Sequence, residues 1–76
     1  MKKIEFEIRK AGEGTDSYIE LNKLLKANQV CESGAAANQL IVEGKVYLNG
    51  NLETRKRAKV RIGDLIMVEN LEIRII

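Results

Sequence analysis

The sequence has no histidine, tryptophan or proline, and Cys31 is the only cysteine among its 76 residues. One cysteine cannot form an intramolecular disulfide, which favours a reducing compartment. Without histidine, Cys31 has no imidazole to act as its base, and one thiolate with scattered carboxylates makes a poor zinc site. No phosphate-binding loop or nucleophile elbow appears. We therefore expect no enzyme activity, no metal and no other cofactor, and we expect Cys31 to be a small buried hydrophobe.

Long apolar runs are also missing. The chain begins with Met1 and two lysines, as a signal peptide can, but apolar and charged residues alternate from residue 4 to residue 9. This alternation leaves no continuous hydrophobic stretch for export, and no run approaches the length that crosses a bilayer. We expect a cytoplasmic protein with no membrane partner.

Positive charge is concentrated in one place. The chain is short enough for residues 1–76 to form a single small domain, and its net charge is +2. Residues 1–43 carry 6 Lys/Arg and 7 Asp/Glu, whereas residues 44–76 carry 7 and 4. Between residues 53 and 61, five basic residues are accompanied by only one acid, Glu53. Such local clustering matters more for nucleic-acid binding than the total charge.

The apolar pattern predicts two short helices and several strands. Helices are expected at residues 21–28 and 34–43, and strands at residues 4–9, 46–48, 52–54, 59–62, 65–68 and 71–75. The segment 11–16 is expected to be a loop, and its role stays open. Alternation along the expected strand at 59–62 places Lys59 and Arg61 on one face, away from Val60 and Ile62.

Local signals define the second helix and the turn that follows it. The Ser33 hydroxyl can accept a hydrogen bond from the first helical turn, and Gly44 stands where a left-handed residue ends a helix. Ala37, Leu40 and Ile41 repeat at helical spacing. The dipeptide at residues 49–50 is Asn-Gly, which suits a type I′ turn between two strands.

This order of parts resembles the RNA-binding domain first described in small-subunit ribosomal protein four, the αL-motif domain. The resemblance covers about residues 18–68 and is carried by these residues: Leu21, Leu24, Leu25, Lys26, Ser33, Gly34, Ala37, Leu40, Ile41, Gly44, Lys45, Val46, Leu48, Asn49, Gly50, Glu53, Thr54, Arg55, Lys56, Arg57, Gly63 and Asp64. The segment 53–57, ETRKR, resembles most the short, stand-alone bacterial members. The resemblance implies an α+β fold: two short helices packed on a small, mostly antiparallel sheet, with added N- and C-terminal strands.

The resemblance also implies the function and the site. We expect a monomer that recognises structured RNA, with ribosomal RNA as the first candidate partner, tRNA as the second, and ribosomal particles as a further one. The expected surface joins the basic loop to the helix and hairpin, where arginine forks and lysine charges would meet phosphates beside a helix N-terminus. The candidate RNA-binding residues are Lys26, Ser33, Gly34, Asn38, Lys45, Asn49, Arg55, Lys56, Arg57, Lys59 and Arg61.

Some residues depart from the family pattern and leave alternatives open. Asn38 and Gln39 make the second helix less basic than in many members, and Val42 and Tyr47 stand where charged residues are common. These two either vary on a tolerant surface, form an apolar patch for a partner, or, in the case of Tyr47, stack on a base. A basic loop can also be a solvated turn. The alternative function is a small protein–protein interaction module, for example one that associates with ribosomes or RNA enzymes. A ubiquitin-like sulfur carrier is disfavoured because such carriers end in Gly-Gly, not Ile-Ile.

Overall fold

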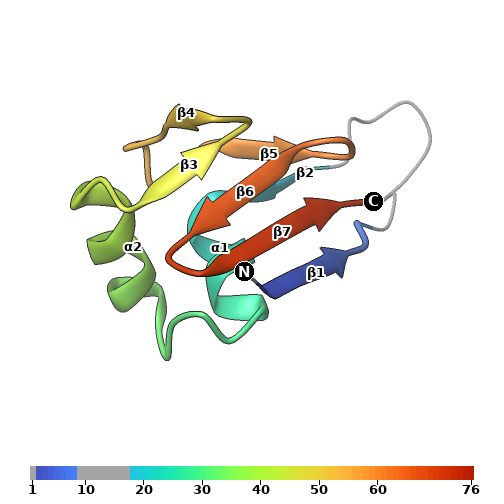
Figure 1. Cartoon of the computed structure of the whole chain (residues 1–76). Helices are drawn as coiled ribbons and strands as arrows, with labels where there is room; N and C mark the ends of the chain where they lie inside the picture. The colour runs from blue at the N-terminus through green and yellow to red at the C-terminus, as the bar shows by residue number, and fades with distance from the viewer. Residues whose placement is uncertain (1, 9–17) are drawn as a thin grey trace.

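The computed structural model describes residues 2–8 and 18–76. The predicted loop at 11–16 and the end of the predicted first strand lie outside the described residues. As expected, the fold is α+β (Figure 1). The elements are β1 (Lys2–Phe6), β2 (Tyr18–Glu20), α1 (Leu21–Ala27), α2 (Gly34–Val42), β3 (Val46–Leu48), β4 (Asn51–Leu52), β5 (Lys59–Arg61), β6 (Leu65–Val68) and β7 (Leu71–Ile75).

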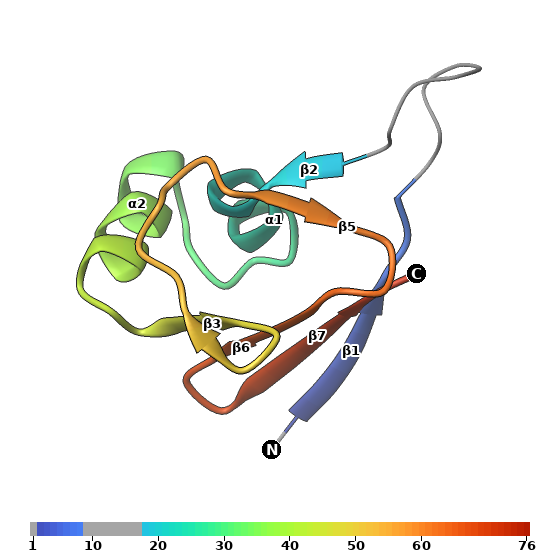
Figure 2. The same cartoon turned by 90° about the horizontal axis from the view of Figure 1, so that it is seen from above.

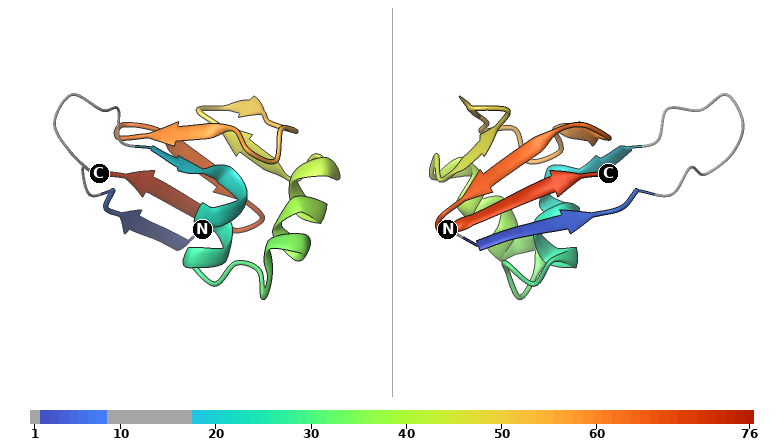
Figure 3. Two further views of the ribbon diagram at one scale, coloured as in Figure 1. Left: turned by 180° about the vertical axis from the view of Figure 1, so that it is seen from behind. Right: turned by 45° about the vertical axis from the view of Figure 1, so that its right-hand side comes forward.

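The strands form a five-stranded sheet and a separate two-stranded ribbon. The sheet has the order β1-β7-β6-β3-β4, and all its pairs are antiparallel except β1 with β7. The predicted terminal strands therefore pair with each other. β2 and β5 pair antiparallel as the ribbon. Figures 2 and 3 show both helices on one side of the five-stranded sheet, with the ribbon beside α1. None of the described elements covers the other face of the sheet, the open sheet face.

One apolar core lies between the helices and the sheet. The predicted inward residues of α1, Leu21, Leu24 and Leu25, have no exposed surface. The other buried apolar residues are Cys31, Ala37, Ile41, Val46, Ala58, Val60, Ile66, Val68, Ile73 and Ile75. Cys31 is thus the buried small side chain that the sequence predicts, and burial raises the pKa of its thiol. Burial of these side chains against each other is the main stabilising term for a chain of this size.

The local signals around α2 are confirmed. The Ser33 hydroxyl oxygen accepts a hydrogen bond from the Ala36 N–H at 3.2 Å, which caps the helix. Gly44 has φ +76°, and the Lys45 N–H donates to the Leu40 carbonyl at 3.2 Å, as in a Schellman ending. Asn49 and Gly50 have φ +51° and +84°, as a type I′ turn requires.

Several boundaries differ from the prediction. The return strand β4 ends at Leu52, and the segment Tyr18–Glu20, which was not predicted as a strand, pairs with β5. The strand predicted at 59–62 ends at Arg61. Ile62, which was expected on the same face as Val60, is 53% exposed, whereas Val60 is buried. The cause is a turn in which the Arg61 N–H donates to the Asp64 carboxylate at 2.8 Å and Gly63 adopts φ +95°.

Candidate nucleic-acid interface

The basic loop, residues 53–58, is bound to the start of α1 by the backbone. The Leu21 N–H donates to the Ala58 carbonyl at 2.9 Å, and the Asn22 N–H donates to the Lys56 carbonyl at 3.1 Å. The Lys23 N–H donates to the Asn22 side-chain oxygen at 2.8 Å. The first three N–H groups of α1 are therefore occupied, so the start of this helix does not offer them to a phosphate. These bonds instead hold the loop in one position.

Arg55 is oriented by Glu53, which is only 9% exposed. The Arg55 Nε and Nη2 atoms donate to the two Glu53 carboxylate oxygens, each at 3.1 Å, and the Arg55 backbone N–H donates to Oε2 at 3.0 Å. These hydrogen bonds lower the pKa of the Glu53 carboxyl and raise the pKa of the Arg55 guanidinium. The Arg55 side chain is still 79% exposed. A guanidinium has five N–H donors, so the donors that Glu53 does not use can meet a phosphate.

The neighbouring cations differ in how they are held. Arg57 Nε lies 3.8 Å from a Glu20 oxygen, and Lys23 lies 3.1 Å from the other. Among residues 2–8 and 18–76, the Lys56 ammonium has no ion-pair partner. Four of the five predicted basic residues, Arg55, Arg57, Lys59 and Arg61, line one hollow of about 450 Å³ with Ala58. The structure thus brings the predicted basic cluster together on one surface.

Lys56 faces α2 across a second hollow of about 330 Å³. The hollow is lined by Ala35, Asn38, Gln39, Val42, Glu43 and Lys56. The Asn38 side-chain oxygen accepts a hydrogen bond from the Asn22 amide at 3.0 Å, which ties α2 to the start of α1. Gln39 donates to Glu43 at 3.0 Å. The α2 side of this hollow therefore carries apolar and polar side chains and one acid but no cation, in agreement with the weakly basic helix that the sequence predicts.

The remaining candidates lie in other places. Lys26 is exposed in the last turn of α1, one turn beyond Asn22. Ser33 and Gly34 form the capped start of α2. The Asn49 side chain is used within the fold: its amide donates to Asp64 at 3.0 Å, and its oxygen accepts from the Leu65 N–H at 2.8 Å. No observation assigns an RNA contact to these residues, so their role stays a prediction.

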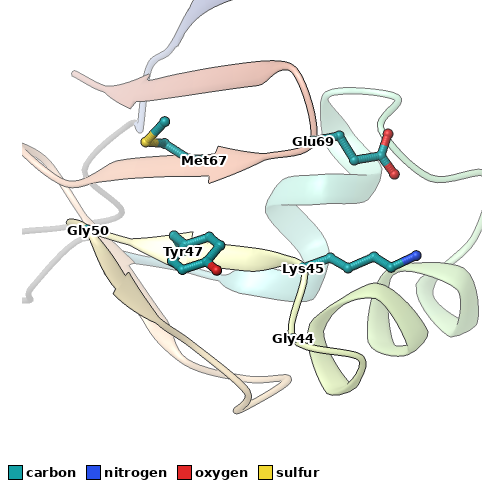
Figure 4. A pocket seen from close by; sticks show the side chains of 6 residues that line it. All are labelled: Gly44, Lys45, Tyr47, Gly50, Met67 and Glu69. Atoms are coloured by element: carbon teal, nitrogen blue, oxygen red, sulfur yellow. The ribbon is translucent and has the colours of Figure 1, made fainter.

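Lys45 lines a different hollow from Arg55, Arg57, Lys59 and Arg61. It pairs with Glu43 at 3.6 Å and lines a hollow of about 550 Å³ with Gly44, Tyr47, Gly50, Met67 and Glu69. Figure 4 shows Tyr47 and Met67 on adjacent strands of this hollow, with Lys45 and Glu69 at one end. Tyr47 and Val42 line different hollows, and the apolar patch that was one alternative stays a prediction.

Sequence reasoning missed three side chains at this surface. They are Tyr18, Glu20 and Asn22, which lie on β2 and at the start of α1. Lys59 lies over the Tyr18 ring, Glu20 pairs with Arg57, and Asn22 bonds to Asn38. The only available signal was the alternation of Tyr18 and Glu20 around Ile19, which is too short to predict a strand.

The described residues contain no group of three or more His, Cys, Asp or Glu side chains placed to hold a metal ion. None of the helices in the described segments is long and apolar enough to span a membrane.

Comparisons with known proteins agree on one family. The family model of the S4 domain matches residues 13–76. The chain is 36% identical over 63 residues to the Escherichia coli protein named "Putative RNA-binding protein YbcJ", covering 83% of this chain and 90% of that protein. The Shigella flexneri protein YbcJ matches to the same extent.

A solved structure has a similar fold. It is the trimeric structure of heat shock protein 15 from Vibrio cholerae, with a TM-score of 0.62 and 27% sequence identity. The similarity covers 68% of this chain and 52% of that one, so the chain spans about half the length of this neighbour.

Proposed function

The chain belongs to the S4 domain family, and we propose that it binds structured RNA through the basic loop and the adjoining surface of α2. The observation that carries the proposal is the fixed basic loop. Its carbonyls accept hydrogen bonds from the α1 backbone, and Arg55, Arg57, Lys59 and Arg61 line one hollow. Cations held in place lose less conformational entropy when they meet phosphates than cations on a mobile segment. The name of the Escherichia coli relative supports the same function.

The proposed RNA is double-helical or folded, and ribosomal RNA is the first candidate. The major groove of A-form RNA is too deep and narrow for side chains to read, so phosphate and 2′-hydroxyl contacts dominate recognition. A row of arginines and lysines suits this chemistry. Transfer RNA is the second candidate. The monomeric state and the cytoplasmic location remain predictions, and sedimentation of the protein alone and with RNA tests the first of them.

The test removes charge where the fold does not depend on it. Arg55 is unsuitable, because its loss leaves the nearly buried Glu53 carboxylate without its partner. The variant is therefore Lys56→Gln with Arg57→Gln. The matched control is Lys2→Gln with Lys3→Gln, which removes the same charge from exposed residues of β1, at the other edge of the five-stranded sheet. Affinity for ribosomal RNA and tRNA is measured by filter binding across salt concentrations, with thermal melts of all three proteins.

If three to five cations meet phosphates, log K should fall with log salt at a slope of about −2 to −4. The loop variant should bind more weakly and with a slope about one to two units shallower, whereas the control should stay close to the wild type. Equal affinity and slope in the wild type and the loop variant, with equal melting temperatures, would show that the loop is a solvated turn. Tighter binding to tRNA than to ribosomal RNA would reverse the order of the two partners.

The second candidate function is a protein-interaction module. The observation in its favour is the hollow on the open sheet face, in which Tyr47 and Met67 present apolar surface. Association through that surface would be insensitive to salt, unlike binding to phosphates. The salt series therefore separates the two functions.

A further inference from the structure

The ribbon of β2 and β5 presents one aromatic side chain next to the basic cluster. In its register Tyr18 lies opposite Arg61, and Glu20 lies opposite Lys59. Between these two pairs, Ile19 lies opposite Val60; Ile19 is half-buried and Val60 is buried. Because side chains alternate along a strand, Tyr18 and Lys59 must lie on the outward face. Tyr18 is 46% exposed there.

The Tyr18 ring is held by Lys59. The Lys59 ammonium lies 5.1 Å from the centre of the ring, which is within the range of a cation–π contact. The acid directly across from Lys59 is Glu20, but the two Glu20 oxygens pair with Lys23 and Arg57. Lys59 therefore extends toward Tyr18, and its charge covers part of the ring while much of the side chain remains exposed.

This arrangement combines the two elements of an unpaired-nucleotide site. Proteins that bind single-stranded segments place aromatic rings for the bases beside cations for the backbone. Arg57, Lys59 and Arg61 line the basic hollow next to Tyr18. The other exposed tyrosine, Tyr47, lies away from that hollow, on the open sheet face beside Met67 (Figure 4). Tyr18 is therefore the candidate stacking residue, and Tyr47 is an internal control for experiments on it.

We propose that Tyr18 stacks on an unpaired base of the bound RNA, while Arg57 and Lys59 hold the phosphates on either side of that base. The inference rests on the proposed RNA binding and adds a feature of the target: a bulged, unpaired base within the helical part. A fully paired helix offers no base face to the ring, so Tyr18 discriminates between the two kinds of RNA.

The experiment compares two probes and three proteins. The probes are a short RNA hairpin with one unpaired adenosine and the same hairpin without that adenosine. The proteins are the wild type, Tyr18→Phe and Tyr18→Leu. We expect Tyr18→Leu to bind the bulged hairpin about fivefold or more weakly, because the stacking partner is lost. Binding to the paired hairpin and the salt slope should be unchanged, and Tyr18→Phe should bind as the wild type does.

Fluorescence provides a second readout. The chain has two tyrosines and no tryptophan, so the Tyr47→Phe variant leaves Tyr18 as its only tyrosine. In that variant, the bulged hairpin should quench tyrosine emission more strongly than the paired hairpin. In the reciprocal Tyr18→Phe variant, the two probes should quench Tyr47 equally.

The outcomes separate the inference from the proposed function. If Tyr18→Leu binds both hairpins like the wild type, while the Lys56/Arg57 variant loses affinity, the stacking role is refuted and RNA binding stands. Equal loss on both hairpins would mean that Tyr18 only positions Lys59, which also refutes stacking. If neither the loop variant nor Tyr18→Leu changes binding to either probe, both the proposed function and the inference fail.

Discussion

Glu53 and Arg55 form a two-point ion pair in which the nearly buried carboxylate fixes the direction of an exposed guanidinium. Both Arg55 to Glu53 side-chain bonds measure 3.1 Å. The pair lies at the start of the basic loop, immediately after β4. The acid in the basic segment is therefore a positioning residue for one of its cations, and the loop has a structure of its own before any RNA binds.

The first prediction concerns this pair and acid pH. Hydrogen bonds from Arg55 lower the pKa of Glu53, so the folded protein binds the proton more weakly than the unfolded chain. Such a carboxyl stabilises the fold above its ordinary pKa, about 4.3, and the stabilisation is lost as pH falls through the lowered value. Glu53→Gln should lower the melting temperature at neutral pH by a few degrees and flatten its decline between about pH 5 and pH 3.

The control for this prediction is Glu43→Gln. The pKa of Glu43 is also lowered, first by Gln39 and then by Lys45, but its side chain is exposed, and solvent screens such pairs. Its melting curve should follow the wild type at every pH. If the melting temperature of the Glu53→Gln protein falls as steeply at acid pH as that of the wild type, the pair does not stabilise the fold.

The second prediction concerns Gly50. Its φ is +84°, and no atom lies within 4 Å of the position a Cβ would occupy, so only the backbone opposes a side chain here. Gly50→Val should destabilise the fold by about 1 kcal/mol or more, because a β-branched residue resists positive φ. Gly34→Ala is the control: the space is also open, but φ is not positive, and alanine favours the helix. Equal melting temperatures for Gly50→Val and the wild type would contradict the type I′ turn.

The third prediction separates turn chemistry from RNA contact at Asn49. Its side chain bonds to Asp64 and to the Leu65 N–H, which joins the β3–β4 hairpin to the start of β6. Asn49→Ala should lower stability by about 1 kcal/mol, since it removes both bonds and keeps a residue at positive φ. Affinity for RNA, measured well below the melting temperature, should not change. A loss of affinity without loss of stability would make Asn49 an RNA contact.

The fourth prediction concerns Cys31. The thiol is nearly buried among apolar side chains, and burial raises its pKa. Alkylating reagents should therefore react slowly with the folded protein and quickly with the unfolded chain. Cys31→Ser should leave RNA affinity intact and reduce stability by about 1–3 kcal/mol, because a hydroxyl is buried in place of a thiol. Fast alkylation of the native protein, or weaker RNA binding by a stably folded Cys31→Ser variant, would contradict the role of a core side chain.

The sequence by itself determined the features that depend on neighbouring residues. The cap at Ser33, the left-handed ending at Gly44 and the Asn49–Gly50 turn follow from backbone conformations that few residue types adopt. The inward residues of α1 follow from helical spacing. The basic cluster is contiguous in the chain, so it remains a cluster in the fold. These signals are local, and in a natural sequence the local preferences agree with the tertiary fold.

Tertiary structure decided which distant residues meet. Three features join segments that are far apart in sequence. They are the parallel pairing of β1 with β7, the ribbon that places Tyr18 beside Lys59, and the hydrogen bonds from α1 N–H groups to loop carbonyls. The predicted strand extended too far, to Ile62, because alternation does not show where a strand ends. In the structure, the turn closed by Asp64 ends the strand at Arg61. Periodicity shows which face of a segment is apolar, but not which segment it packs against. That choice depends on the whole core, because backbone groups must be paired and apolar surface covered at the same time.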